Sequence, residues 1–440
     1  MYPFSGVRIF DYSMRLLPLL IILLLLGAGL QAQRAPDRIY RPGILSVKLC
    51  PAGRPIDYPI LRLQSNDKLE LMFDEQGTEV RNYFYTFELC NADWTPAALS
   101  YFDYVKGYSQ VRIGTYRNSS LALTRYVHYS AVLPDRNCTP TKSGNYLLKV
   151  FLNSDTSQLA FTRRFLVLDD RIQLAVQVRQ PFQQASFLSH HRLQVTLSGK
   201  GIDIRYPQQQ VKVQVLQNLR WDNRLQLQQP TFVRQAVLEY NNEAEMLMPA
   251  MKEWRWLNLR SFRLLGDRVS FQRNTDSSFS VFVQEESPRP ANRYVYYKDI
   301  NGMYFFETIE AVNPFWNGEY ARVHFRFRPP GGQPYRGKDL YIIGEMTGYG
   351  SLEGSRLRYD PSLGIYTTEL FLKQGYYDYC YALRDSQDPS APFDTEPTEN
   401  NSWETENTYM VLAYYRDLGG RYDQLLGIYQ AGSVQLRTLR

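Results

Sequence analysis

The four histidines are the first residues to consider for chemistry, because histidine serves as a general base and a metal ligand near neutral pH. His190 and His191 are adjacent, so on a strand their side chains point to opposite faces and do not bind one ion together. His128 and His324 lie in alternating, strand-like runs, where a histidine at the solvated edge of a core is typical. The sequence therefore predicts no histidine-based metal site or nucleophile.

Motifs that mark common enzyme classes are missing from the sequence. It has no G-x-S-x-G elbow, no H-E-x-x-H pair and no Walker loop. Residues 344–350, GEMTGYG, lack the strand-to-helix context of a phosphate-binding loop, and we interpret them as a turn. A hydrolase that pairs carboxylates from distant loops stays an open alternative, which requires one cleft with several acids of strongly shifted pKa. We expect no enzyme activity, no metal and no cofactor.

The sequence does not determine how the cysteines pair. The four residues Cys50, Cys90, Cys138 and Cys380 allow three full disulfide pairings, and the spacing does not choose among them. Three of them lie in the N-terminal third of the chain, so we expect any bridge there. Buried free thiols are the alternative.

A short aromatic stretch, NYFYTFELCNADWTP at residues 82–96, could build either a binding loop or the corner of a sheet. Its first half alternates like a strand. Asn91 and Asp93 can each bond to following backbone amides and close an Asx-type turn, with Trp94 covering the end of the sheet. A fold-making corner is the favoured interpretation, and partner binding is the alternative.

The loop over residues 91–108 gathers aromatic side chains without alternation, which is typical of an interaction surface. The candidate partner-binding residues are Asn91, Asp93, Trp94, Tyr101, Phe102, Tyr104 and Tyr108.

The elements that must position these residues are strands. Segments such as IQLAVQVRQP, HRLQVTL and RVHFRFRPP alternate apolar and polar residues and are separated by Gly, Pro and Asn. The sequence predicts an all-β protein with three tandem immunoglobulin-like β-sandwich domains after a cleaved signal peptide. The expected bounds are 40–170, 171–312 and 315–430, the last resembling early-set sandwiches. Asn301-Gly302, between two aromatic runs, predicts a two-residue hairpin.

The N-terminal residues predict export. Residues 1–32 contain a basic start at Met14-Arg15, a short apolar run and a small-residue cleavage site after Ala32, as in a secretory signal peptide. The net charge of +6 is mild, and no Lys/Arg run marks nucleic-acid binding. We expect an exported protein without a membrane span and without a nucleic-acid or small-molecule partner.

Several segments, in the same order, resemble the type IX secretion system plug protein family. They are LCPAGRPIDYPILRL (49–63), NYFYTFELCNADWTP, SGNYLLKVF (143–151), EWRWLNLRS (253–261), YYKDINGMY (296–304), LKQGYYDYCYAL (372–383) and the stretch over 403–427. Cys50 departs from the family pattern, where Tyr or His is more usual, which puts in doubt only a local bridge between Cys50 and Cys90.

The resemblance implies a non-enzymatic periplasmic protein at the periplasmic face of the outer membrane. It implies that the protein binds the translocon β-barrel and sterically seals its periplasmic opening when no substrate is in transit.

Two further alternatives stay open. The third unit also resembles carbohydrate-binding sandwiches of the cell envelope, in which Tyr349 or Trp403 would stack on a sugar. A structural linker in envelope motility machinery would share the location but bind a filamentous or multi-protein set of partners.

Overall fold

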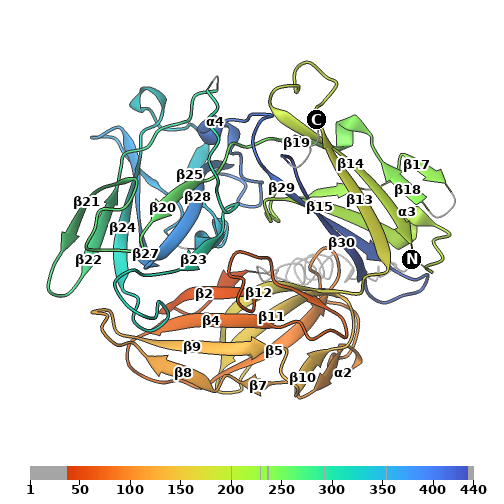
Figure 1. Cartoon of the computed structure of the whole chain (residues 1–440), viewed down its shortest axis with the longest axis horizontal. Coiled ribbons are helices and arrows are strands. Elements are labelled where there is room, and N and C mark those ends of the chain that lie inside the picture. The colour runs from red at the N-terminus through yellow and green to blue at the C-terminus, as the bar shows by residue number, and fades with distance from the viewer. Residues whose placement is uncertain are drawn as a thin grey trace, which may run out of the picture. The chain divides into compact units, whose positions relative to one another are not determined.

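The computed structural model describes residues 37–434 except 200, 228, 235–236, 292 and 353. The expected signal peptide, residues 1–32, lies outside the described residues. Within them, no helix has the length and apolarity needed to cross a membrane. The described chain is built from strands in two-layered sandwiches, so the predicted all-β class is confirmed (Figure 1).

The first sandwich holds the N-terminal strands around a core rich in aromatic rings. One sheet orders β1 (Arg38–Ile39), β12 (Leu159–Leu168), β11 (Gly144–Leu152), β5 (Tyr83–Cys90) and β7 (Val111–Arg112), with β3 (Ile60–Arg62) also on β12. The other orders β2 (Ile44–Pro51), β4 (Leu69–Gln76), β9 (Tyr126–Leu133) and β8 (Thr115–Asn118). The short elements α2 (Tyr101–Tyr104), β6 (Val105–Gly107) and β10 (Cys138–Pro140) lie at one end. In the core, the Phe73 ring stacks on Tyr129 and meets Tyr83 edge-on.

The second sandwich combines strands from two distant parts of the chain. One sheet orders β13 (Ile172–Arg179), β14 (His190–Gly199), β18 (Val237–Tyr240) and β17 (Phe232–Arg234), with β19 (Leu247–Pro249) also on β14. The other orders β16 (Leu225–Leu227), β15 (Val211–Gln217), β29 (Thr408–Tyr415) and β30 (Gln424–Gly432). The short helices α3 (Pro207–Gln210) and η1 (Glu243–Glu245) lie in its loops.

The third sandwich lies between β19 and β29 in the sequence. One sheet orders β20 (Arg255–Asn258), β28 (Gly375–Asp385) and β23 (Tyr304–Phe306), with β25 (Lys338–Ile343) also on β28. The other orders β21 (Val269–Asn274), β22 (Phe279–Val283), β24 (Tyr320–Phe327), β27 (Ile365–Lys373) and β26 (Arg358–Asp360). Its connections include η2 (Pro330–Gly332), η3 (Glu345–Thr347) and α4 (Glu396–Glu399).

The expected boundaries 171–312 and 315–430 are therefore wrong. Strand β29 pairs with β15 from Val211↔Tyr415 to Gln217↔Tyr409, so the C-terminal strands complete the second sandwich and the third is inserted within it. In Figure 1 the dark blue β29 lies beside the green β15. Alternation reveals that a segment is a strand but not which sheet it joins. The first sandwich, expected at 40–170, runs from β1, which begins at Arg38, to β12, which ends at Leu168.

The Asn301-Gly302 turn is present, but it does not close a hairpin. Both residues have positive φ, 55° and 81°, as a two-residue turn requires. The segment after the turn forms a strand, β23, whereas the residues directly before it, 293–300, do not. A Cβ on Gly302 would lie 2.7 Å from the Trp254 ring, so the close packing on Trp254 also requires glycine.

All four cysteines are buried and free. The structure therefore agrees with the alternative of buried free thiols, and Cys50 and Cys90 form no local bridge.

Candidate functional site: sandwich junctions and exposed loops

The Asn91–Trp94 corner is a junction within the chain. The Oδ1 atom of Asn91 accepts a hydrogen bond from Arg416 Nη2 at 2.8 Å and one from the Asp423 backbone amide at 3.3 Å. The Trp94 ring is buried and meets Trp221 of the second sandwich edge-on, with centroids 4.9 Å apart. These two side chains are already occupied by the second sandwich, so they are not available to an external partner.

Asp93 makes the predicted Asx turn. Its Oδ1 accepts from the Thr95 amide at 3.0 Å and from the Thr95 hydroxyl at 2.6 Å. Burial alone would raise the pKa of Asp93, but its hydrogen bonds with Thr95 lower it below the usual value. The turn part of the prediction is confirmed for Asp93, whereas the Asn91 side chain bonds across the junction instead.

The remaining candidates divide by exposure. Tyr104 is buried and Tyr101 half-buried, with the Tyr101 hydroxyl donating to the Tyr108 carbonyl at 3.2 Å. Phe102 and Tyr108 are 71% and 67% exposed. Of the seven residues, Phe102 and Tyr108 thus present large apolar surface to solvent, from a short helix and the strand end beside it.

A second junction joins the first and third sandwiches through buried charges. The Lys373 ammonium lies 2.5 Å from Asp74 Oδ2, and each side chain is only 1% exposed. Tyr320 donates to the same oxygen at 2.6 Å, and His128 Nδ1 lies 2.6 Å from Asp74 Oδ1. Burial alone would raise the pKa of Asp74, but Lys373 and His128 hold it below its usual value. Charges as deeply buried as these hold their partners in one arrangement, because separating them leaves each one unpaired.

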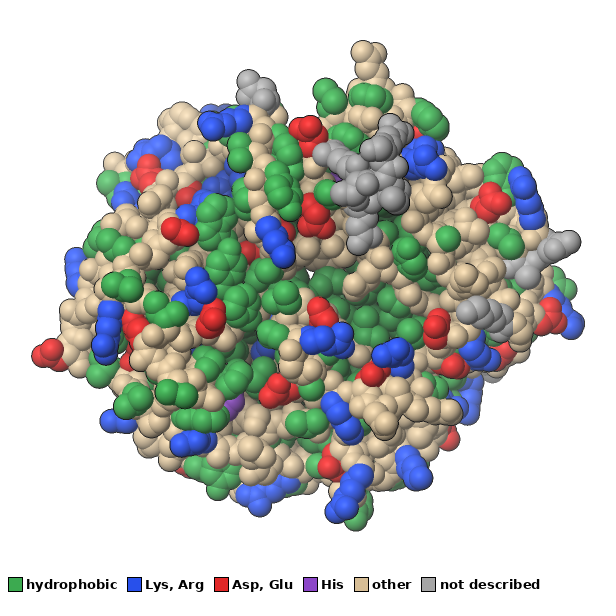
Figure 2. Space-filling model, in the orientation of Figure 1, with side chains coloured by type: hydrophobic (Ala, Val, Ile, Leu, Met, Phe, Trp, Pro, Cys, Tyr) green, Lys and Arg blue, Asp and Glu red, His purple; other side chains and the backbone are tan. Residues whose placement is uncertain are grey.

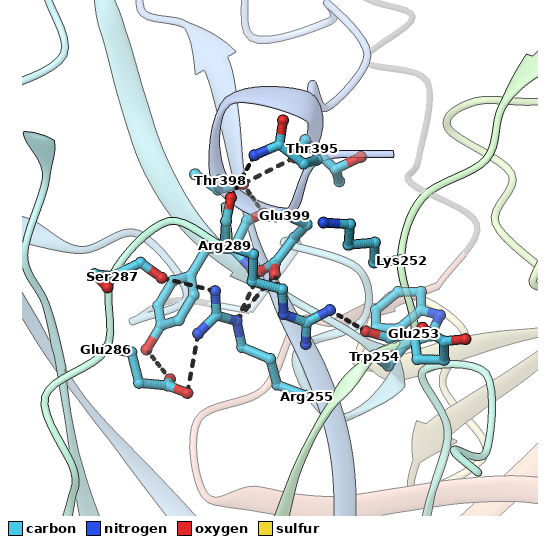
Figure 3. Close-up of polar contacts among 12 residues, drawn as sticks. Lys252, Glu253, Trp254, Arg255, Glu286, Ser287, Arg289, Thr395, Thr398 and Glu399 are labelled. Carbon is cyan, nitrogen blue, oxygen red and sulfur yellow. Dashed lines mark hydrogen bonds and ion pairs between the residues drawn. The ribbon is translucent and has the colours of Figure 1, made fainter. Parts of the chain in front are cut away.

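The third sandwich contains its own buried ionic cluster (Figure 3). Arg255 donates to both Glu399 oxygens at 3.0 Å and to Glu286 Oε1 at 3.1 Å. Tyr379 and Tyr381 each donate to Glu286 Oε2 at 2.8 Å. Burial alone would raise the pKa of Glu286, yet Arg255 and Arg268 hold it below its usual value. Arg255, Glu286 and Glu399 are hydrogen-bonded and almost fully enclosed, which is typical of a structural network.

A cleft of about 580 Å³ opens where segments of all three sandwiches meet. Its wall includes Tyr58 of the first sandwich, Leu219 of the second and Asp299, Ile300 and Met303 of the third. Figure 2 shows hydrophobic side chains gathered around the hollow at the centre of the molecule. Clefts at domain junctions are common binding sites.

Two buried carboxyl groups lie near this cleft: Asp299 lines it, and Asp378 does not. Burial raises the pKa of Asp299 to about 7 and that of Asp378 to about 8; Asp299 adds to the shift of Asp378. Asp378 Oδ2 accepts from the Ile300 amide at 2.6 Å, and Asp299 Oδ2 accepts from the Trp254 amide at 2.6 Å. Both groups thus hold the Asn301-Gly302 turn in place.

The carboxyl pair offers little for hydrolysis. Asp378 is fully buried and does not line the cleft, whereas Asp299 lines it but uses both oxygens to accept backbone amides. Among the described residues, no group of three or more His, Cys, Asp or Glu side chains could hold a metal ion.

The two candidate sugar-stacking residues are both engaged in packing. Tyr349 lies against the buried cluster that contains Met251 and Trp254, and its ring meets Trp254 edge-on. Trp403 is half-buried, with its ring 4.8 Å from that of His191. The structure therefore gives no open aromatic platform at these two positions.

The sequence analysis did not predict the buried charged residues of the third sandwich and of its junction with the first. In β20, Arg255 and Leu257 are two residues apart, so both side chains point into the sandwich. A charged residue at such a position indicates a buried ion pair, and the sequence alone shows it. Lys373 and Asp74 carried no such signal, because the partners are 299 residues apart in the chain.

Comparison with known proteins identifies the first sandwich. A crystal structure of a hypothetical protein from Parabacteroides merdae ATCC 43184 is similar to this chain, with a TM-score of 0.84 and 27% identity; the match covers 90% of this chain and 98% of that one. No curated protein matches. Residues 44–169 match the family model described as Type 9 secretion system plug protein 1st domain, which connects the chain with type IX secretion and the cell envelope. The resemblance predicted from the sequence is thereby confirmed for residues 44–169, which match the first domain of the type IX secretion system plug protein family.

Proposed function

We propose that the protein is a non-enzymatic plug, which binds the translocon β-barrel at the periplasmic face of the outer membrane and closes its periplasmic opening when no substrate is in transit. The match of residues 44–169 to the plug protein first domain is the observation that carries this proposal. A plug of this kind works by steric exclusion and needs no reacting group.

The junctions between the sandwiches support a steric mechanism. The first sandwich contacts the third through the Asp74–Lys373 pair. It contacts the second through the hydrogen bond between Asn91 and the Asp423 amide. Both contacts involve buried side chains with several hydrogen bonds each. A body joined in this way resists deformation, so it can obstruct an opening without a hinge or a lid.

The partner is tested by a pull-down of the tagged mature protein from gently solubilised outer membranes, with mass spectrometry of the recovered proteins. We expect one very large β-barrel protein at near-equal stoichiometry. Recovery of a filamentous or multi-protein set would favour the structural-linker alternative. Well-folded bait that recovers no barrel would contradict the proposal.

The exposed aromatics of the first sandwich are the expected contact. Replacing Phe102 and Tyr108 together with aspartate should weaken barrel binding at least about tenfold, because exposed aromatic side chains are typical anchors of protein interfaces. Affinity is measured by titration of the purified barrel. The matched control is Phe232→Asp, a 49% exposed ring on β17 of the second sandwich. Equal affinities for both variants and the unaltered protein would exclude this loop as the contact.

A further inference from the structure

Two loops of the third sandwich expose four aliphatic side chains. Leu264 and Leu265 are each 64% exposed, Ile309 is 63% exposed and Val312 is fully exposed. We call these four residues the aliphatic tip. Isolated apolar side chains on a surface are ordinary, but four on adjoining loops indicate a surface that is covered in use.

Hydrogen bonds hold the two loops together. Glu310 Oε1 accepts from the backbone amides of Phe262 at 2.9 Å and Arg263 at 3.0 Å, and the Ile309 amide donates to the Arg260 carbonyl at 3.1 Å. The second Glu310 oxygen accepts from Gln374 at 2.8 Å, which joins the loops to the sandwich. The tip is therefore preorganised.

The leucine loop also turns tightly. The Leu264 amide donates to Ser261 Oγ at 2.9 Å. A Cβ on Gly266 would lie 2.3 Å from the Asn258 carbonyl oxygen, so only glycine fits there. The turn thus presents Leu264 and Leu265 outward, at the cost of leaving both side chains in water.

The chemistry of the tip fits lipid better than protein. Protein interface anchors are mainly Trp, Tyr and Arg, with Leu and Val under-represented, and the tip has no aromatic residue. Acyl chains accept aliphatic groups without directional contacts. Arg263, next to Leu264, is exposed and makes no ion pair with any described residue, although Asp267 lies exposed in the same loop. A free guanidinium beside an apolar tip complements the phosphate of a lipid headgroup.

We propose that the aliphatic tip inserts into the headgroup and upper acyl region of a phospholipid bilayer. This inference rests on the proposed function only in one respect, the identity of the bilayer, which would be the inner leaflet of the outer membrane. A shallow apolar insertion with one basic group gives weak, reversible binding, so the tip would orient a protein that its barrel partner holds.

Co-sedimentation of the mature protein with vesicles of phosphatidylethanolamine and phosphatidylglycerol tests the proposal without the barrel. We expect the unaltered protein to partition onto these vesicles and less onto phosphatidylcholine alone. Leu264→Ser/Leu265→Ser should lower the partition coefficient about tenfold or more, because each leucine loses its apolar burial. The matched control is Leu363→Ser/Leu418→Ser, two leucines 54% and 56% exposed in other loops, which should not alter binding.

Two outcomes would overturn the proposal. One is that the unaltered protein fails to sediment with vesicles, or that the control pair lowers sedimentation as much as the tip pair. The other is that the tip variant still binds vesicles but no longer recovers the barrel in the pull-down, which would make the tip a protein contact. Failure of vesicle binding with intact barrel recovery leaves the plug function standing.

Discussion

Replacing Lys373 with methionine is expected to destabilise the protein by about 3–5 kcal/mol, the usual effect of leaving a buried charge without its partner. Lys373 and Asp74 are each 1% exposed, so water cannot replace the lost ammonium group. Methionine keeps most of the apolar stem of the lysine side chain, so the loss of stability reflects mainly the missing charge. Unfolding in urea, followed by tryptophan fluorescence, measures the change.

A matched control separates this effect from the loss of a lysine. Lys338 pairs with Asp394 at 3.3 Å, but both side chains are more than 40% exposed. Lys338→Met should change stability by less than about 1 kcal/mol, as exposed ion pairs usually do. If both variants unfold at the same urea concentration, the buried pair does not hold the first and third sandwiches together.

The second large effect is a loss of stability with rising pH, caused by Asp299 and Asp378. The pKa values of both groups are raised by burial, to about 7 and about 8, from an ordinary value of 3.8. The folded protein therefore holds their protons more tightly than the unfolded chain does. The contribution of these two groups to the free energy of unfolding is complete below about pH 4 and is lost as the pH rises through 7 and 8.

Asp378→Asn should remove much of this dependence. The amide oxygen can still accept from the Ile300 amide, but no charge develops at position 378 as the pH rises. We expect the variant to be more stable than the unaltered protein above pH 8, by on the order of 3 kcal/mol, with little difference at pH 5. Thermal unfolding across pH 5–9 measures the slope. Asp276→Asn, at an exposed position, should leave the slope unchanged. An Asp378→Asn protein with the same slope as its parent would contradict the assignment.

The strands could be predicted from sequence because burial follows the pleat of each strand. In β13, Ile172, Leu174 and Val178 are buried, whereas Gln173 and Gln177 are exposed. The same period does not reveal sheet membership. For that reason the expected bounds 315–430 include β29 and β30, although both strands belong to the second sandwich.

In the candidate site too, contacts between neighbours in the sequence could be predicted, whereas contacts between distant residues could not. The Asx turn at Asp93 depends on neighbours two residues away, and the sequence predicted it. The environment of Trp94 depends on Trp221, which the fold brings to it from the second sandwich. From the sequence alone, a tryptophan that follows a strand fits two roles equally well: an exposed anchor for a partner, or a buried residue between two domains. Only the docking of two sandwiches distinguishes the two cases.

The most direct test of the proposed function is the ion current through the purified translocon barrel in a planar lipid bilayer, before and after the mature protein is added to the periplasmic side. The account predicts that the current falls to near the level of the bare bilayer as the protein reaches equal stoichiometry with the barrel. A barrel that binds the protein yet conducts undiminished current would contradict the claim that this protein seals the opening.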